Sequence, residues 1–184
     1  MLEPLKYFLF SIKAKNMKFK ILFISLILML ALFVPKAITA EPKSTGKYKN
    51  WQSFMAQTDK GKICFAQTIP AKRAPKNIKR QESRLFVTFR PGEDVKDEVS
   101  ITSGHPYKSS TVTAKSGKNS FSFFSQENFA WLLDEREEKN FIKVMKRATN
   151  LIVTANMTNG AQTVDHYSMM GFTKAYNTAK KSCS

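Results

Sequence analysis

Cysteine, histidine, glycine and proline are all scarce in this chain. Its 184 residues include two Cys, two His, seven Gly and seven Pro. So few cysteines exclude a disulfide-dense miniprotein, and so few glycines and prolines exclude a fibrous chain. Acidic residues are also few, with 14 Asp and Glu against 30 Lys and Arg, which gives a net charge of +16. The 42% of apolar residues excludes an intrinsically disordered chain, so one compact domain is expected.

The first forty residues have the order of a secretory signal peptide. A short basic segment, Met17–Lys20, precedes the fourteen residues Ile21–Val34, of which only one is polar. The small-residue stretch Ala37–Ala40 then matches a cleavage site. We expect cleavage after Ala40, with Thr39 as the alternative, so that residues 1–40 form a cleaved leader.

Two alternatives to this interpretation stay open. One is a transmembrane anchor, although fourteen residues span only about 21 Å as a helix, against about 30 Å for the hydrocarbon core. The other concerns the start of the chain, because Met1 and Met17 are both candidate initiators. Without residues 1–40 the chain keeps 24 Lys and Arg against 13 Asp and Glu, a net charge of +11. No transmembrane span is expected in this mature chain.

The two cysteines are expected to form a structural disulfide bond. An even count in an oxidising compartment favours a bridge over catalysis or metal binding. Cys64 lies in a predicted strand and Cys183 is the penultimate residue, so the bond would tie the C-terminus to the sheet. Neither cysteine lies in a CxxC motif, which a redox role usually requires.

Strand patterns dominate residues 50–184, and two segments have helical periodicity. Residues 41–49, rich in Lys, Ser, Thr and Gly, are predicted to form a flexible linker. Strands are expected at 51–58, 63–68, 84–90, 98–103, 110–114, 120–123 and 129–133. Helices are expected at 135–147 and 173–181, because apolar residues recur there every three or four positions. The predicted fold class is mostly β: an antiparallel, β-sandwich-like single domain, residues 50–184, with two short α-helices.

Asn159-Gly160 is the strongest turn signal, because both residues tolerate the positive φ angles of a type I′ turn. A two-residue loop at this point places Val153 opposite His166 and Ile152 opposite Tyr167. The loop length therefore fixes the register of this hairpin.

In the order of its landmarks, the chain resembles the invasion-associated locus B family of exported α-proteobacterial proteins over about residues 50–183. The resemblance rests on Trp51, the Gly61–Cys64 segment, the connection from Arg90-Pro91 to Ser100, Ala130-Trp131 before an acidic helix, and the Asp165–Phe172 segment before a helix that ends near Cys183. It implies a β-sandwich-like exported domain and a bridge between the two cysteines. It also implies an association with host-cell invasion in some pathogens.

The sequence gives little support for catalysis, and neither a cofactor nor a metal is expected. His105 and His166 are the only histidines, and neither has the spacing of a metal site such as HExxH. Asp165 precedes His166, but neighbours on a strand point to opposite faces, so this carboxylate is badly placed to orient the imidazole. A GxSxG motif is absent from the sequence. A periplasmic hydrolase that uses His166 is the alternative interpretation.

The best candidate for a binding site is a basic stretch between two predicted strands, which Pro70 and Pro75 keep as a loop. Its cations, opposed only by Glu82, are Lys72, Arg73, Lys76, Lys79, Arg80 and Arg84. A loop with six positive charges attracts anionic partners, which outside the cytoplasm are lipid head groups, lipopolysaccharide or acidic glycans. Nucleic acid is not expected there. The alternative is a solvated loop whose charge keeps the protein soluble.

Taken together, these patterns predict an exported, non-enzymatic interaction protein. Its expected location is the periplasm, the outer membrane or the medium. The expected partner is an anionic envelope or host surface, bound through the basic loop.

Overall fold

A computed structural model describes residues 41–109 and 111–184. The predicted leader and Ser110 lie outside these residues. The strands of the described part are β1 (Lys43–Tyr48), β2 (Trp51–Thr58), β3 (Gly61–Thr68), β4 (Lys72–Ala74), β5 (Arg84–Arg90), β6 (Val95–Thr102), β7 (Val112–Ser116), β8 (Asn119–Gln126), β9 (Phe129–Trp131), β10 (Asn150–Asn156) and β11 (Gln162–Ser168). The helices are α2 (Glu135–Met145) and α3 (Phe172–Ser182), with a 3-10 turn at Pro91–Glu93. No helix among the described residues is long and apolar enough to cross a membrane.

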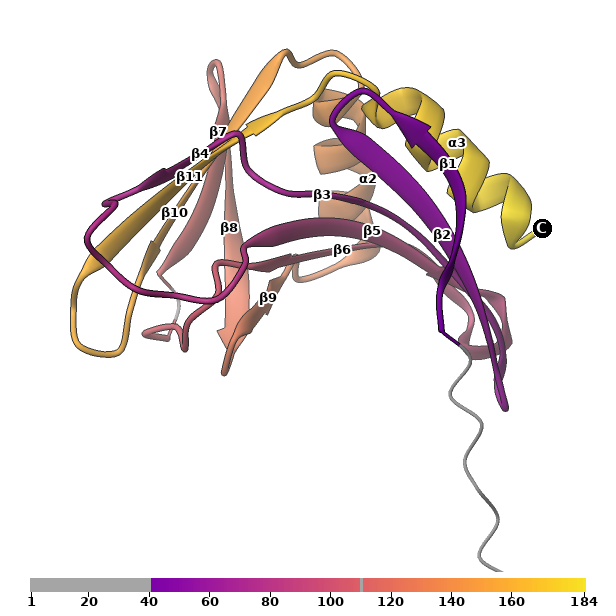
Figure 1. Cartoon of the computed structure of the whole chain (residues 1–184), viewed down its shortest axis with the longest axis horizontal. Coiled ribbons are helices and arrows are strands. Elements are labelled where there is room, and N and C mark those ends of the chain that lie inside the picture. Colours follow the sequence, from indigo (N-terminus) through magenta and orange to yellow (C-terminus); the bar gives the residue numbers. More distant parts are fainter. Residues whose placement is uncertain (1–40, 110) are drawn as a thin grey trace, which may run out of the picture. The chain divides into compact units, whose positions relative to one another are not determined.

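The predicted fold class, mostly β and antiparallel with two short helices, is confirmed. The strands belong to one open sheet with the order β1-β2-β3-β5-β6-β9-β8-β7-β10-β11-β4. Strand β8 pairs with β9 on one side and with β7 on the other, so it joins the two parts of the sheet. Figure 1 shows that β7 and β8 run in a different direction from β5 and β6. A single bent sheet therefore encloses the core. In a β-sandwich, two separate sheets enclose it.

Both helices pack on the same face of this sheet, which we call the inner face. Trp51 of β2 contacts Phe172 of α3, with ring centroids 4.8 Å apart. Phe141 of α2 contacts Phe121 of β8, also at 4.8 Å. The cross-strand register places these sheet residues on one face, and their side chains are at most 9% exposed. The core lies between the inner face and the helices, and the opposite face of the sheet is the outer face.

Glu138 is a charged residue on the core-facing side of α2. Its side chain accepts a hydrogen bond from the backbone N–H of Val99, at 3.2 Å, and the residue is only 9% exposed. Burial raises the pKa of this carboxyl from 4.5 to about 7. The folded-state pKa thus exceeds the unfolded one, so the folded protein loses stability as the pH rises from about 4.5 to about 7.

Glu138→Gln is therefore expected to stabilise the protein at pH 8 by about 1–3 kcal/mol and to have little effect at pH 4, where the carboxyl is protonated in both states. The amide still accepts the hydrogen bond from Val99. Urea unfolding of both proteins at the two pH values measures this difference. Glu135→Gln is the matched control, because Lys139 lowers the pKa of that exposed carboxyl. An equal gain from Glu138→Gln at both pH values would contradict the prediction.

Residues 43–48 form strand β1, where the sequence predicted a flexible linker. This edge strand pairs with β2, from Lys43 opposite Met55 to Tyr48 opposite Trp51. The Tyr48 hydroxyl also makes a 2.9 Å hydrogen bond with that of Thr178 on α3. The side chains of β1 are exposed or partly exposed and mostly polar, which is usual for an edge strand, so no apolar alternation marks it in the sequence.

Met157 and Ala161 continue the pairing of β10 and β11, which leaves a loop of three residues, 158–160. The sequence predicted a two-residue turn at Asn159-Gly160. The N–H of Gly160 donates to the carbonyl of Met157 at 2.9 Å, and the N–H of Met157 donates to the carbonyl of Ala161 at 2.8 Å. Gly160 has a φ of 86°. This is the common three-residue hairpin loop, in which the glycine supplies the left-handed residue after a tight turn.

The extra loop residue shifts the hairpin register, so the predicted pairing of Val153 with His166 is wrong. Val153 lies opposite Asp165, and Ile152 lies opposite His166. Because side chains alternate along a strand, a shift of one residue exchanges the faces. Asp165 therefore points to the inner face and is 1% exposed, whereas His166 is partly exposed on the outer face.

Candidate functional site

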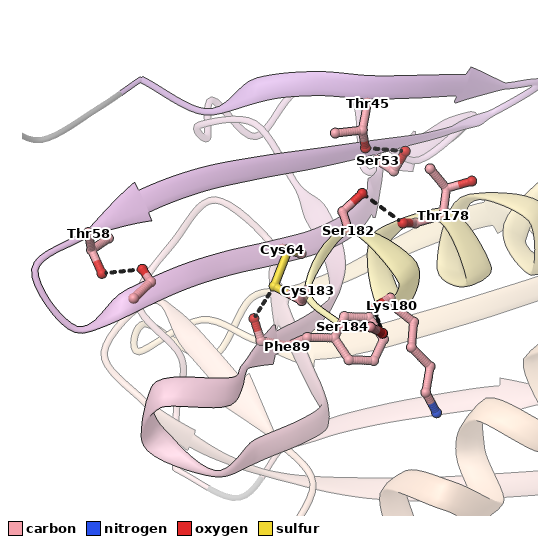
Figure 2. The surroundings of a disulfide bond; sticks show 11 residues. Thr45, Ser53, Thr58, Cys64, Phe89, Thr178, Lys180, Ser182, Cys183 and Ser184 are labelled. Carbon is pink, nitrogen blue, oxygen red and sulfur yellow. Dashed lines mark hydrogen bonds between the residues drawn. A yellow bond between two sulfur atoms is a disulfide. The ribbon is translucent and has the colours of Figure 1, made fainter.

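The two cysteines lie together at the C-terminal end of α3 (Figure 2). Cys64 of β3 and Cys183 are 119 residues apart in sequence, with Cα atoms 5.8 Å apart in a disulfide. The expected cysteine pair, compatible with a disulfide bond, is confirmed. Cys64 is fully buried in the core, so this bridge fastens α3 to the sheet and has the surroundings of a structural bond.

The six cations predicted to form one binding loop fall into two groups in the structure. Lys72, Lys76 and Lys79 are exposed. Each of the three arginines faces a carboxylate: Arg73 and Arg80 face Asp165, and Arg84 pairs with Glu82. The segment is also a loop only in part, because β4 pairs with β11 at the edge of the sheet.

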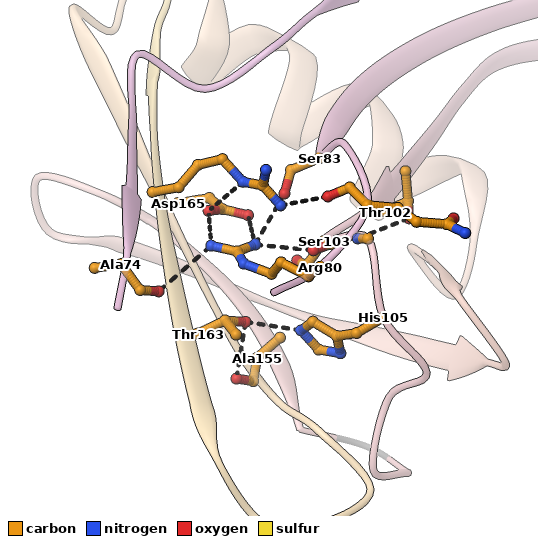
Figure 3. A network of polar contacts seen from close by, with 12 residues as sticks. Ala74, Arg80, Ser83, Thr102, Ser103, His105, Ala155, Thr163 and Asp165 are labelled. Atoms are coloured by element: carbon orange, nitrogen blue, oxygen red, sulfur yellow. Dashed lines mark hydrogen bonds and ion pairs between the residues drawn. The ribbon is translucent and has the colours of Figure 1, made fainter. Parts of the chain in front are cut away.

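Arg80 lies inside the protein, so its predicted place on a binding surface is wrong. Its guanidinium donates two hydrogen bonds to Asp165, at 2.8 and 2.6 Å (Figure 3). It also donates to the carbonyl of Ser103 at 2.8 Å and to the hydroxyl of Ser83 at 2.9 Å. The side chains of Arg80 and Asp165 are only 2% and 1% exposed. Such a bidentate, buried pair orders the segment before β5 and leaves no charge for an external anion.

Sequence reasoning missed this ion pair because of the hairpin register. The predicted two-residue loop placed His166, rather than Asp165, across from Val153. With the observed three-residue loop, Asp165 faces the core and requires a cation. The signal in the sequence is the strongly basic segment at residues 72–84, which offers several cations that could neutralise an aspartate facing the core.

Neither histidine has the surroundings of a catalytic base. His105 is 3% exposed, and its Nε2 lies 2.9 Å from the hydroxyl of Thr163. Burial lowers the pKa of His105, which favours the neutral ring. His166 and Asp165 point to opposite faces, and the carboxylate is already held by Arg80. Among residues 41–109 and 111–184, no group of three His, Cys, Asp or Glu side chains could hold a metal ion.

A surface hollow of about 450 Å³ brings cations from distant segments together. Lys47 and Lys49 reach it from β1 and the turn before β2, and Arg84 reaches it from β5. The amide side chains of Gln52 and Gln67 line its wall. Sequence reasoning missed the two lysines because residues 41–49 were taken for a linker.

The charge of this hollow is positive. Glu82 also lines it and pairs with Arg84, which offsets that one cation. Lys47 and Lys49 form no ion pair with a described residue. Two cations are therefore available to an anion that enters the hollow.

The fold and these surfaces define a disulfide-fastened, antiparallel β domain with a basic exterior. Comparison of the chain with protein-family models, with curated proteins and with solved structures finds no match.

Proposed function

We propose that this protein is an exported, non-enzymatic envelope or secreted interaction protein that binds anionic surfaces through exposed lysines. The observation that carries the proposal is the grouping of unpaired cations along one edge segment. Lys72, Lys76 and Lys79 are exposed there, and none forms an ion pair with a described residue. Residues 41–184 have a net charge of +11, which adds long-range attraction.

The proposed partners are anionic groups of the envelope or of a host surface: lipid head groups, lipopolysaccharide phosphates and acidic glycans. Export follows from the predicted leader, which lies outside the described residues, and agrees with the cysteine pair. The resemblance to the invasion-associated locus B family extends the proposal to a link with host-cell invasion. In this proposal Arg73 and Arg80 position the segment through Asp165, whereas the lysines contact the partner.

Replacing Lys72, Lys76 and Lys79 by Ser is expected to weaken binding to phosphatidylglycerol vesicles about tenfold to a hundredfold. A lysine near an anionic surface contributes about 1 kcal/mol, so the full loss of three, about 3 kcal/mol, corresponds to the upper end of this range. Added salt should weaken wild-type binding as well, because it screens exposed charges. Co-sedimentation with the vesicles measures both effects.

A matched control removes three exposed lysines elsewhere: Lys108→Ser, Lys115→Ser and Lys118→Ser. This variant has the same net charge, so it should lose clearly less affinity if the proposed segment makes the contact. Equal losses in the two variants would contradict a localised site, and binding that ignores salt would contradict the proposal itself.

A further inference from the structure

Six aromatic side chains lie on the outer face of the sheet, away from both helices. We call them the outer aromatic face: Phe54, Phe65, Phe86, Phe124, Phe129 and Trp131. Several of their sequence neighbours are fully buried on the inner face: Leu85 and Val87 beside Phe86, Cys64 and Ala66 beside Phe65, and Ala130 beside Phe129 and Trp131. Alternation along each strand thus assigns these rings to the surface, and none of them belongs to the core cluster.

The strand register joins the outer aromatic face to the basic hollow in one continuous row. The row passes from one residue to its cross-strand partner through Lys47, Gln52, Gln67, Phe86, Ser100, Trp131 and Phe124. At about 4.8 Å between strands, these seven positions extend over about 29 Å. Lys47, Gln52 and Gln67 also line the hollow. One end of the row is therefore cationic and the other end is apolar.

The apolar end of the row has exposed apolar side chains. Phe124 is 52% exposed and Phe129 is 41% exposed. Leu133, two residues after Trp131, is 78% exposed. At the cationic end, Ile69 lines the hollow and is 51% exposed. Grouped exposed apolar side chains of this size mark an interaction surface.

The rings of the outer aromatic face are packed against one another. Phe54 and Phe65 stack with centroids 5.2 Å apart and planes at 17°, and Phe129 and Trp131 stack at 5.9 Å and 27°. Together with the exposed aliphatic side chains of Leu133 and Ile69, they offer apolar surface that hydrocarbon chains can contact.

We propose that the outer aromatic face docks on the surface of an anionic phospholipid bilayer. Phe124 and Leu133 enter the boundary of the hydrocarbon, while Lys47 and Lys49 contact lipid phosphates at the other end of the row. The combination of apolar side chains with neighbouring lysines is the one that interfacial membrane binding uses. This inference rests on the proposed function, because it names the lipid surface as the anionic partner and adds an apolar contact to it.

Trp131 provides a direct test, because the chain has two Trp and the other, Trp51, is fully buried. The protein, as isolated from the expressing cell, is mixed with phosphatidylglycerol vesicles that carry bromine on the acyl chains. We expect quenching of Trp131 fluorescence on binding, because bromine quenches only at close range. Vesicle binding without quenching would overturn the inference.

The matched variants are Phe124→Ser with Leu133→Ser, and as control Ile152→Ser with Met170→Ser. The control pair is also exposed, at 38% and 54%, but lies outside the outer aromatic face. The first variant is expected to bind vesicles about tenfold more weakly, because apolar side chains of this size contribute strongly to the binding free energy when the bilayer buries them. The control should bind like the wild type, and urea unfolding checks that both variants stay folded.

The outcomes separate this inference from the proposed function. Suppose that replacing Lys72, Lys76 and Lys79 by Ser abolishes vesicle binding but Phe124→Ser with Leu133→Ser leaves it unchanged. The apolar docking is then wrong and the electrostatic proposal stands. Two further results would also overturn the inference. One is that the protein binds vesicles of uncharged lipid as strongly as phosphatidylglycerol vesicles. The other is that the protein is a dimer, which Phe124→Ser with Leu133→Ser converts to a monomer. The dimer would make the outer aromatic face a contact between copies of this chain.

Discussion

Asp165→Asn is expected to lower the free energy of unfolding by about 3–5 kcal/mol, which is the range for breaking one partner of a buried ion pair. The substitution leaves the guanidinium of Arg80 charged and 2% exposed, beside a neutral amide. Arg73, whose Nε lies 4.0 Å from the same carboxylate, loses its partner as well. Urea unfolding followed by circular dichroism measures the loss.

Two further variants sharpen this test. Arg80→Met with Asp165→Leu removes both charges, and it should recover most of the loss, because an apolar pair of similar volume leaves no buried charge uncompensated. Lys60→Gln removes one of the two cations that pair with Glu93, in an exposed ion pair, and should leave stability unchanged within error. A single Asp165→Asn variant as stable as the wild type would show that the pair is not buried in solution.

Replacing Cys64 and Cys183 by Ala is expected to lower the free energy of unfolding by about 2–5 kcal/mol. The bond closes a loop of 119 residues, so its removal frees a large part of the unfolded chain. The effect should be greatest near α3, because Cys183 holds the end of that helix against β3. Urea unfolding gives the total loss, and hydrogen exchange shows where protection decreases.

The reductant response provides the control for this second prediction. Wild-type protein should be destabilised by dithiothreitol to about the level of the Cys64→Ala, Cys183→Ala variant, and the variant itself should not respond. Wild-type stability that is indifferent to reductant, with two free thiols after isolation, would contradict a bridge in the cellular protein.

The buried pair of Arg80 and Asp165 limits which residues can be replaced in a binding test. A variant that replaces Arg80 together with the lysines would be destabilised, because the arginine neutralises Asp165. Its weaker binding would then reflect the loss of folded protein as well as the loss of contacts with the ligand. Binding tests must therefore keep Arg80 and Arg73 and change only exposed residues. The same reasoning makes Phe124 and Leu133 suitable targets, since they are 52% and 78% exposed.

Local sequence patterns are sufficient to predict the class of fold and most of its elements. Strands β2 and β5 have the predicted bounds, and α2 and α3 lie within one or two residues of theirs. These elements have strong local signals: alternation with period two in the strands, and apolar residues every three or four positions in the helices. The cysteine pair could also be predicted, because only one pairing exists.

Which charges are exposed and which are buried depends on how distant segments pack together. Because the loop at 158–160 has one residue more than predicted, Asp165 points to the core. Arg80 is buried with it because the two side chains form an ion pair. Strand β1 exists because its backbone pairs with β2, and pairing of backbone groups leaves no pattern in polar side chains. The row from Lys47 to Phe124 crosses seven strands, which belong to the segment from residue 43 to residue 131. Such a surface is a property of strand order and register, which the local sequence does not encode.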